Sequence, residues 1–251
     1  MKARWGRIAA AAAVALVVGA AAATAGGAWS AERRDAQALA SQARTIAHLE
    51  TELQSLDARA APDWAAVAAQ VAPSVVTIST DADLGSGWVA HSDSSGSDIV
   101  TNFHVVADAV AAGTKAVDVL RLDEVLSGII VSTDRTDDLA VIHVSERLTP
   151  LVAAAARPRI GSMVMAAGSP LGLSGTVSVG VVSGFRSLFG SDYLQFTAAI
   201  SPGNSGGPVV DRHGRVVGIA TAKLLADGAE ALGFAIPVQT ACASLVACEL
   251  A

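Results

Sequence analysis

The sequence predicts an all-β domain that follows a helical N-terminal region. From Ser74 onward, short β-branched runs alternate with Gly, Ser and Asp. Many short strands at this spacing are typical of an antiparallel barrel or sandwich, because the strands of a parallel α/β sheet need helices between them. The chain of 251 residues is long enough for one large domain or two small ones with real cores.

The N-terminus combines a basic head, residues 1–7, with an uncharged apolar run, residues 8–28. Such a run can just cross a hydrocarbon core of about 30 Å. The basic flank predicts a cytoplasmic N-terminus, with the rest of the chain outside. We favour an uncleaved signal anchor. The alternative is a signal peptide cleaved after Ala25, since Ala23-Thr24-Ala25 resembles a signal-peptidase site.

Residues 29–62 are expected to form a helical stalk, because no proline or glycine occurs between Glu32 and Ala60. Apolar residues recur there with a seven-residue period, which indicates a short coiled coil and self-association through residues 32–60. The alternative is a single amphipathic helix lying on the following domain or on lipid. The apolar positions are Leu39, Ile46, Leu49, Leu53 and Leu56, and Gln42 is the polar break.

The domain expected over residues 63–251 contains few helices. A short helix is predicted for 64–71, a crossover between two halves for 148–160, and a terminal helix for 238–250, after Pro237. The strand-like runs are 75–78, 87–89, 98–101, 117–120, 129–131, 139–142, 163–165, 176–179, 193–196, 216–219 and 233–236.

Charge and cysteine content exclude several classes of function. The net charge is −6, and without the three basic residues of the head it is 14 − 23 = −9. Such an acidic surface argues against a nucleic-acid partner. The only cysteines, Cys242 and Cys248, would lie about 9 Å apart along one helix, too far for a disulfide without local unwinding. We therefore expect them to be unpaired, and we expect no metal site.

Chemistry is expected at the turn 201–208, where Ser205 lies among glycines between two strand-like runs. Glycines allow the backbone to expose the Ser205 hydroxyl while nearby N–H groups converge on one point. A serine alone is a poor nucleophile, so it needs a base and a third group that orients the base.

The base is expected to be His104, which follows a strand and precedes a helical turn. Of the other four histidines, His48 falls in the stalk, His91 and His213 in polar loops, and His143 inside a strand. Only the ring of His104 has the setting of a strand end, from which it can reach a neighbouring nucleophile.

Asp138 is the candidate for the orienting acid. It directly precedes the apolar run 139–142, where a carboxylate is costly unless it has a partner. Asp134 and Asp137 are better interpreted as turn residues. The alternative makes Asp138 a turn residue as well.

The order His104, Asp138, Ser205 with these local sequences resembles the trypsin-like (chymotrypsin-fold) serine proteases, and more closely their HtrA/DegP/DegQ-type branch. The similarity covers about residues 63–251. It rests on seven motifs in the same order: Gly85-Ser86-Gly87-Trp88-Val89, Thr101-Asn102-Phe103-His104-Val105-Val106, Asp138-Leu139-Ala140-Val141, Ala167-Gly168-Ser169-Pro170-Leu171-Gly172, the run 176–183, the turn 201–208, and Gly233-Phe234-Ala235-Ile236-Pro237.

The resemblance implies two six-stranded antiparallel barrels with the active site in the cleft between them. Ser205 would be the nucleophile, His104 the general base and Asp138 the orienting acid. The N–H groups of Gly203 and Ser205, together with Asn204, would form the oxyanion hole. No cofactor is implied.

The resemblance also places the primary substrate pocket. Its lining would be Ala199, Ile200 and Ser201 before the nucleophile, and Ile219, Ala220, Thr221 and Ala222 on the following strand. None of these is acidic, so cleavage after Lys or Arg is not expected, and a small aliphatic P1 residue is. The substrate backbone would pair with the 219–222 edge as an added strand.

Three positions depart from the family patterns. Asn204 replaces the acid that digestive members keep before the nucleophile, so their zymogen switch is not expected. Thr197 lies where HtrA-type chains usually carry Asp, in the loop 196–202. No PDZ domain is expected after the protease domain, and hence no peptide sensing through one.

The sequence thus predicts a membrane-anchored serine endopeptidase that cleaves proteins or peptides outside the cytoplasm, in envelope quality control or regulated proteolysis. One alternative is a secreted form released by signal-peptide cleavage. Another is a binding or scaffold protein that keeps the fold without activity. A hydrolase of small esters is disfavoured, because no Gly-x-Ser-x-Gly elbow with interleaved helices is present.

Overall fold

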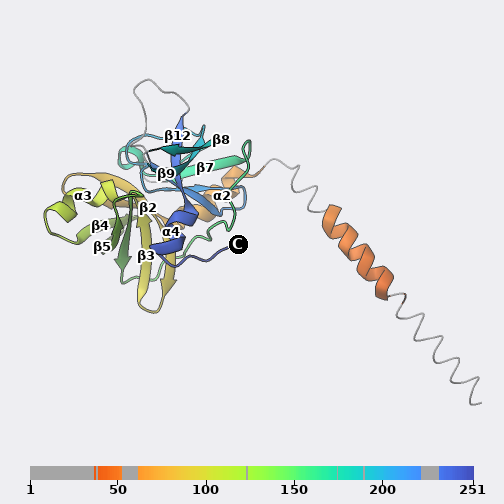
Figure 1. Ribbon diagram of the computed structural model, residues 1–251. Helices are drawn as coiled ribbons and strands as arrows, with labels where there is room; N and C mark the ends of the chain where they lie inside the picture. Colours follow the sequence, from red (N-terminus) through yellow and green to blue (C-terminus); the bar gives the residue numbers. More distant parts are fainter. Residues whose placement is uncertain are drawn as a thin grey trace, which may run out of the picture. The chain divides into compact units, whose positions relative to one another are not determined.

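The computed structural model describes residues 37, 39–52, 62–122, 124–173, 175–188, 190–221 and 232–251 (Figure 1). The chain divides into two units, Met1–Ala61 and Pro62–Ala251. The predicted basic head and the apolar span 8–28 lie outside the described residues.

Six strands form the first closed barrel, in the order β1-β2-β3-β6-β5-β4. All neighbouring strands are antiparallel. Along β5, Leu126, Gly128 and Ile130 are buried while Val125 and Ile129 are exposed, as expected for a strand with one face on the core. The strands are β1 (Val75–Ser79), β2 (Leu84–Asp93), β3 (Gly96–Thr101), β4 (Ala116–Arg121), β5 (Glu124–Asp134) and β6 (Leu139–Val144).

The second barrel is also closed and antiparallel, in the order β10-β11-β12-β9-β8-β7. The two six-stranded barrels confirm the predicted fold class. The three-residue strand β10 was missed by the sequence analysis, because it directly follows the glycine turn. The strands are β7 (Met163–Gly168), β8 (Thr176–Leu188), β9 (Ser191–Phe196), β10 (Pro208–Val210), β11 (Val216–Thr221) and β12 (Gly233–Pro237).

In the described part of this unit, the barrels are accompanied by the α-helices α2 (Trp64–Val71), α3 (Phe103–Ala111) and α4 (Val238–Ser244), with short 3₁₀ turns η1 (Ala72–Ser74) and η2 (Pro170–Gly172). Helix α2 matches its predicted bounds and begins after Asp63, whose carboxylate accepts the N–H groups of Ala65 and Ala66. No strand or helix interrupts the crossover from β6 to β7, apart from an isolated bridge at Ala153.

Three apolar cores hold this unit together. One fills the first barrel, and another fills the second. The third lies between them, and it joins Trp88 and Leu139 of the first barrel with Met165 and Ile219 of the second. Trp88 belongs to this shared core while its neighbour Val89 points into the first barrel, because successive strand residues face opposite sides.

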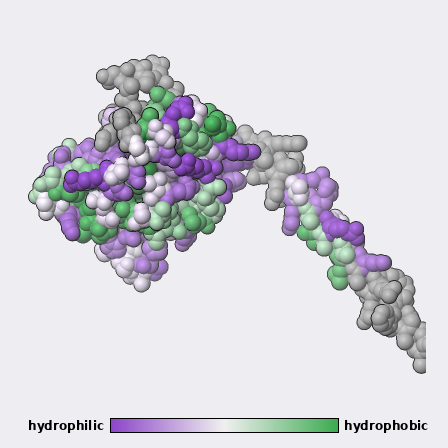
Figure 2. Space-filling model, in the orientation of Figure 1, coloured by the Kyte–Doolittle hydropathy of each residue, from purple (hydrophilic) through white to green (hydrophobic). Residues whose placement is uncertain are grey.

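In the N-terminal unit, residues 39–52 are helical, within the predicted stalk. Leu39, Ile46 and Leu49 are exposed on this helix. Figure 2 shows apolar and polar side chains next to one another on its surface. Its pairing with a second helix stays a prediction. Among the described residues, no helix is both long and apolar enough to cross a membrane.

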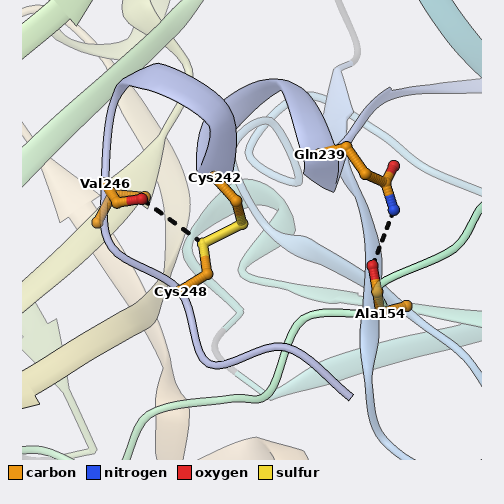
Figure 3. The surroundings of a disulfide bond; sticks show 5 residues. All are labelled: Ala154, Gln239, Cys242, Val246 and Cys248. Atoms are coloured by element: carbon orange, nitrogen blue, oxygen red, sulfur yellow. Dashed lines mark hydrogen bonds between the residues drawn. A yellow bond between two sulfur atoms is a disulfide. The ribbon is translucent and has the colours of Figure 1, made fainter.

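The prediction for the two cysteines was wrong. Cys242 and Cys248 form a disulfide, with 5.5 Å between their Cα atoms (Figure 3). The predicted helix 238–250 was too long, since α4 ends at Ser244. The chain then turns back, and its last residues pair with the crossover: the Ala153 N–H donates to Glu249 and the Ala155 N–H to Ala251. The spacing argument failed because the cysteines do not share one helix.

His91 was also misplaced, since it lies in β2 rather than in a loop, whereas His213 lies in a turn as predicted.

The disulfide should stabilise the domain by closing a short loop. Replacing both cysteines with serine removes this constraint on the unfolded chain, which for a separation of six residues costs about 2 kcal/mol. The urea midpoint of the double variant should therefore fall. Wild-type protein in excess dithiothreitol serves as the matched control and should unfold at the same lower midpoint. A midpoint that neither change moves would contradict the expectation.

Candidate active site

Asp138 caps the N-terminus of α3. Its backbone carbonyl accepts the Phe103 N–H at 3.0 Å and the Asn102 side-chain amide at 2.9 Å, and its Oδ1 accepts the His104 N–H at 2.9 Å. The first N–H groups of a helix have no partner inside the helix, so a carboxylate there is stabilising. Asp138 adopts a left-handed backbone with φ of 55°, which Asp tolerates better than most residues.

The same carboxylate orients the His104 ring. Asp138 Oδ2 lies 2.7 Å from His104 Nδ1. An ionised carboxylate can only accept a hydrogen bond, so Nδ1 carries the proton and Nε2 of the neutral ring keeps a free lone pair. This is the tautomer that a general base needs.

The second barrel contacts the loop between β5 and β6, which carries Asp138 and which we call the acid loop. Ser191, at the start of β9, donates from its hydroxyl to Asp137 Oδ1 at 2.9 Å and approaches the Thr136 carbonyl at 3.3 Å. Tyr193 lies two residues further along β9. Burial raises the pKa of Tyr193, and the negative charges of Asp138 and Asp137 raise it further. The acid loop is therefore held from both barrels.

Ser205 lies in a turn of the second barrel and is 4% exposed. Gly203 and Gly206, on either side, have φ angles of 97° and 87°, which residues with a side chain rarely adopt. The Gly206 N–H donates to Ala220 and the Gly207 N–H donates to Asn204. The glycines thus allow the tight turn that was predicted.

This turn packs directly against the first barrel. A Cβ on Gly206 would lie 2.2 Å from the Ser86 carbonyl, 2.3 Å from Thr101 Oγ1 and 3.0 Å from the Asn102 nitrogen. No other residue type fits there. The Ser205 turn consequently lies against residue 102, two positions from His104.

The three candidate oxyanion donors differ in their hydrogen bonds. The Asn204 N–H donates to the Ser201 carbonyl at 3.0 Å, so it is engaged inside the turn. Within the described parts of the chain, the buried Gly203 N–H donates to no protein acceptor. The Asn204 N–H is thus already used inside the turn, and the oxyanion role of these residues stays a prediction.

The residues predicted to line the pocket lie around the same turn. Ala199 and Ser201 are exposed and Ile200 is half-buried, whereas Ile219, Ala220 and Thr221 are at most 1% exposed; Ala222 lies outside the described residues.

The loop 196–202 is hydrogen-bonded to β8. The Ser178 hydroxyl donates to the Ala199 carbonyl at 2.6 Å, and Thr197 Oγ1 accepts the Val181 N–H at 3.0 Å.

Most of the predicted substrate edge is already paired. Ala220 donates its N–H to Gly207 and accepts the Gly206 N–H, while Ile219 and Thr221 pair with β12. Addition of a substrate strand along the 219–222 edge stays a prediction.

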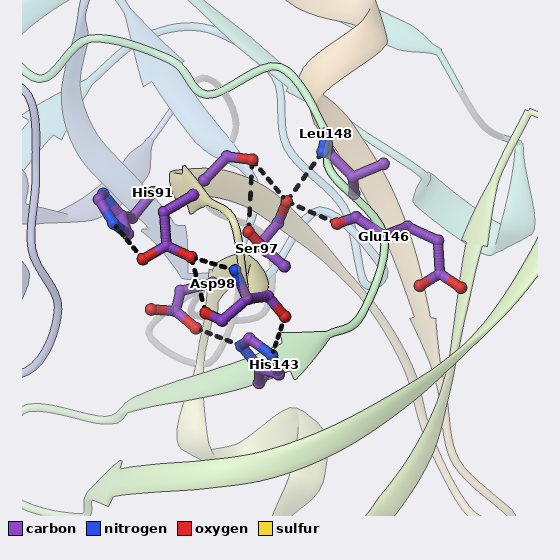
Figure 4. Close-up of polar contacts among 10 residues, drawn as sticks. His91, Ser97, Asp98, His143, Glu146 and Leu148 are labelled. Carbon is purple, nitrogen blue, oxygen red and sulfur yellow. Dashed lines mark hydrogen bonds and ion pairs between the residues drawn. The ribbon is translucent and has the colours of Figure 1, made fainter.

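A second His–Asp pair occurs on the first barrel (Figure 4). His143 Nδ1 lies 2.8 Å from Asp98 Oδ1, and Nε2 lies 3.3 Å from the Ser95 carbonyl. These residues are register partners on β6 and β3, and they clamp the turn between β2 and β3. The hydrogen bond with Asp98 raises the pKa of His143, although burial opposes this.

In the part of the chain that the structure describes, no group of His, Cys, Asp or Glu side chains could hold a metal ion.

Sequence reasoning did not assign roles to Ser86, Thr101 and Asn102. All three are fully buried and contact the Ser205 turn or Asp138. They lie in the motifs Gly85-Ser86-Gly87 and Thr101-Asn102-Phe103-His104. Membership of these motifs was the sequence signal from which a role near the site could have been predicted.

The trypsin-like peptidase domain family matches residues 85–219, a range that includes His104, Asp138 and Ser205. This match covers 135 of the 251 residues, and the chain belongs to the trypsin-like peptidase family. The active form of the Rv3671c protease from M. tuberculosis has a similar crystal structure, with a TM-score of 0.63 at 29% identity over 74% of this chain and 87% of that chain.

Two curated relatives are similar in sequence. Serine protease Do-like HtrB of Bacillus subtilis is 39% identical over 166 residues, which cover 61% of this chain and 35% of that protein. The Bartonella henselae protein named "Probable periplasmic serine endoprotease DegP-like" is 40% identical over 166 residues, covering 63% and 32%. The chain therefore spans about a third of the length of these relatives.

The His143–Asp98 pair should make stability depend on pH. Because the folded-state pKa of His143 is raised above its ordinary value of 6.5, the contribution is complete below that value and is lost as the pH rises through the raised pKa. His143→Gln should therefore destabilise the protein at pH 5.5 more than at pH 8.5, by no more than about 1 kcal/mol.

Urea unfolding at the two pH values measures this difference. His213→Gln is the matched control, because His213 is exposed in a turn. Equal destabilisation by His143→Gln at both pH values would show that the ion pair contributes nothing.

Proposed function

We propose that residues 62–251 act as a serine endopeptidase. Ser205 attacks the scissile carbonyl carbon while His104 Nε2 takes the hydroxyl proton. The resulting imidazolium is stabilised by Asp138. His104 then gives this proton to the leaving amine, and an acyl-enzyme forms on Ser205 Oγ. Water, activated by the same ring, releases the acyl group and restores the serine.

The main observation behind this proposal is that the Asp138 carboxylate makes two hydrogen bonds with His104. Oδ2 lies 2.7 Å from His104 Nδ1 and orients the ring, while Oδ1 accepts the backbone N–H of His104 at 2.9 Å. The Ser205 turn packs next to these bonds, against Asn102. Barrel packing alone does not require these three residue types at these positions. The family membership and the names of the curated relatives support the same activity.

The negative charge that develops on the substrate oxygen would be stabilised by the N–H groups of Gly203 and Ser205. The Gly203 N–H suits this role because it is buried and donates to no other acceptor in the described chain. Asn204 occupies the position of the zymogen acid in digestive relatives, so the proposal includes no activation through a freed N-terminus.

We place the domain on the extracytoplasmic side of a membrane, anchored by residues 8–28, with a self-associating stalk over residues 29–62 between the anchor and the domain. The basic head and the apolar run support this orientation. The disulfide fits it too, because disulfides persist in oxidising compartments. The substrates would be proteins or peptides there, processed in envelope quality control or regulated proteolysis.

Active-site labelling tests the proposed activity. A fluorophosphonate probe should label the folded wild-type domain, and Ser205→Ala should abolish the labelling because no other nucleophile is oriented there. Asp138→Asn should lower kcat roughly 10⁴-fold on a peptide substrate, because an amide no longer favours the His104 tautomer that carries its proton on Nδ1. A well-folded wild-type domain without labelling or hydrolysis would favour the catalytically silent scaffold instead.

The primary pocket should select small aliphatic residues. None of its predicted lining residues is acidic, and burying an unpaired cation costs several kcal/mol. Peptides with Val or Ala at P1 should therefore exceed matched Lys peptides in kcat/KM by about 100-fold or more. Ala199→Asp supplies a partner charge and should reduce this ratio. Faster cleavage after Lys by the wild-type protein would overturn the proposed specificity.

A further inference from the structure

Ser86, on β2 of the first barrel, reaches across to the nucleophile turn of the second. Its hydroxyl donates to the Gly203 carbonyl at 2.6 Å, and its backbone N–H donates to the Ser205 carbonyl at 2.8 Å. Ser86 has no exposed surface, and Gly203 and Ser205 are buried as well. Water cannot readily replace hydrogen bonds at such depth, so both are costly to lose. We name this contact of Ser86 with Gly203 and Ser205 the Ser86 bridge.

The direction of the Ser86 hydroxyl is determined by its neighbours. Ser86 Oγ accepts the Ser169 N–H at 2.8 Å, so its single hydrogen remains for the Gly203 carbonyl. Ser169 Oγ in turn accepts the Thr77 hydroxyl at 2.6 Å. Thr101 Oγ1 donates to the Ser86 carbonyl at 2.7 Å and holds the backbone of β2 in place. All of these side chains are at most 4% exposed.

The bridge fixes one peptide unit of the turn at both ends. The carbonyl of the Gly203–Asn204 peptide binds Ser86, and its N–H binds the Ser201 carbonyl. A planar peptide held at both ends cannot rotate without breaking both bonds. The Gly203 N–H belongs to the preceding Pro202–Gly203 peptide, which joins the held peptide at the Gly203 Cα. Glycine allows more φ and ψ combinations than other residues, and Gly203 has a φ of 97°, so fixing the Gly203–Asn204 peptide removes one of the rotations through which this N–H could turn.

The fold also leaves room for the bridge. A Cβ on Gly168, at the end of β7, would lie 2.8 Å from Ser86 Oγ and 2.8 Å from Asn204 Oδ1. Any side chain at this position would push on the bridge from the second barrel.

We infer that Ser86 is a positioning residue for the oxyanion hole: by holding the Gly203 carbonyl, it keeps the Gly203 N–H directed at the substrate oxygen. This inference rests on the proposed endopeptidase function. Ser86 makes its contribution when the oxyanion forms, so its loss slows the chemical step and leaves substrate binding nearly unchanged.

The test compares Ser86→Ala with Ser97→Ala in the full chain. Ser97 is the matched control because it is a buried serine of the same barrel, and its hydroxyl bonds to Glu146 and Leu148 away from the turn (Figure 4). Ser86→Ala should lower kcat about 10- to 100-fold, less than the loss of an oxyanion donor itself, with KM changed less than about threefold. Fluorophosphonate labelling should slow in parallel. Ser97→Ala should keep the wild-type kcat and labelling rate, whatever its effect on the melting temperature.

Each other outcome has a defined meaning. A wild-type kcat for Ser86→Ala, even with a lowered melting temperature, overturns the inference and leaves the proposed function intact. If Ser86→Ala does not fold, Ser86→Cys decides: it keeps the volume but has only a weak donor, so a wild-type kcat again overturns the inference. A folded wild-type protein without activity refutes the proposed function, and the inference with it.

Discussion

The contact between the two barrels is the constraint on which the rest of the site depends. His104 and Asp138 belong to the first barrel, and Ser205 belongs to the second. The barrels share one apolar core, and the turn of Ser205 approaches the first barrel so closely that Gly206 has no space for a side chain. Each barrel is closed and complete by itself, but neither contains all the groups that the proposed chemistry needs.

Hydrogen bonds across this contact hold the loop that carries Asp138 and the turn that carries Ser205. The acid loop receives Ser191 from the second barrel, and the nucleophile turn receives Ser86 from the first. Both serines bind backbone or loop atoms next to the groups that would act on substrate. Apolar packing is non-directional, so it can bring the barrels together, whereas the directional hydrogen bonds determine where His104 and the Gly203 N–H point.

Asp138 illustrates how one residue links local structure to the site. It ends a turn in a left-handed conformation, caps α3 and orients the His104 ring. The helix start that carries His104 is thus stabilised by the carboxylate that would assist catalysis. The sequence identified Asp138 from its position before an apolar strand, but its capping of α3 depends on a contact across 34 residues.

The sequence analysis failed where distant contacts override the local pattern and where the local pattern is too short to be informative. The segment 238–250 was predicted to be one helix, but after Ser244 the chain instead pairs with the crossover at Ala153 and Ala155 and closes a disulfide. Strand β10 was missed because three residues after a glycine turn carry too little periodicity. The bond of the Asn204 N–H to Ser201 could not be read from the sequence either.

The sequence by itself determined the strand-rich class of the domain, the positions of most strands, and the residues Ser205, His104 and Asp138 as candidates, because alternation, turn residues and motifs are local properties of the chain. Only the tertiary structure decided the pairing of the cysteines, the backbone hydrogen bonds of Asn204 and Ala220, and the contacts of Ser86 and Ser191 with the opposite barrel. Ser86 and Gly203 meet across 117 positions, and Ser191 and Asp137 meet across 54. The cysteines are only six residues apart, but they pair where the chain turns back after Ser244 to reach Ala153 and Ala155. No local sequence pattern encodes these contacts.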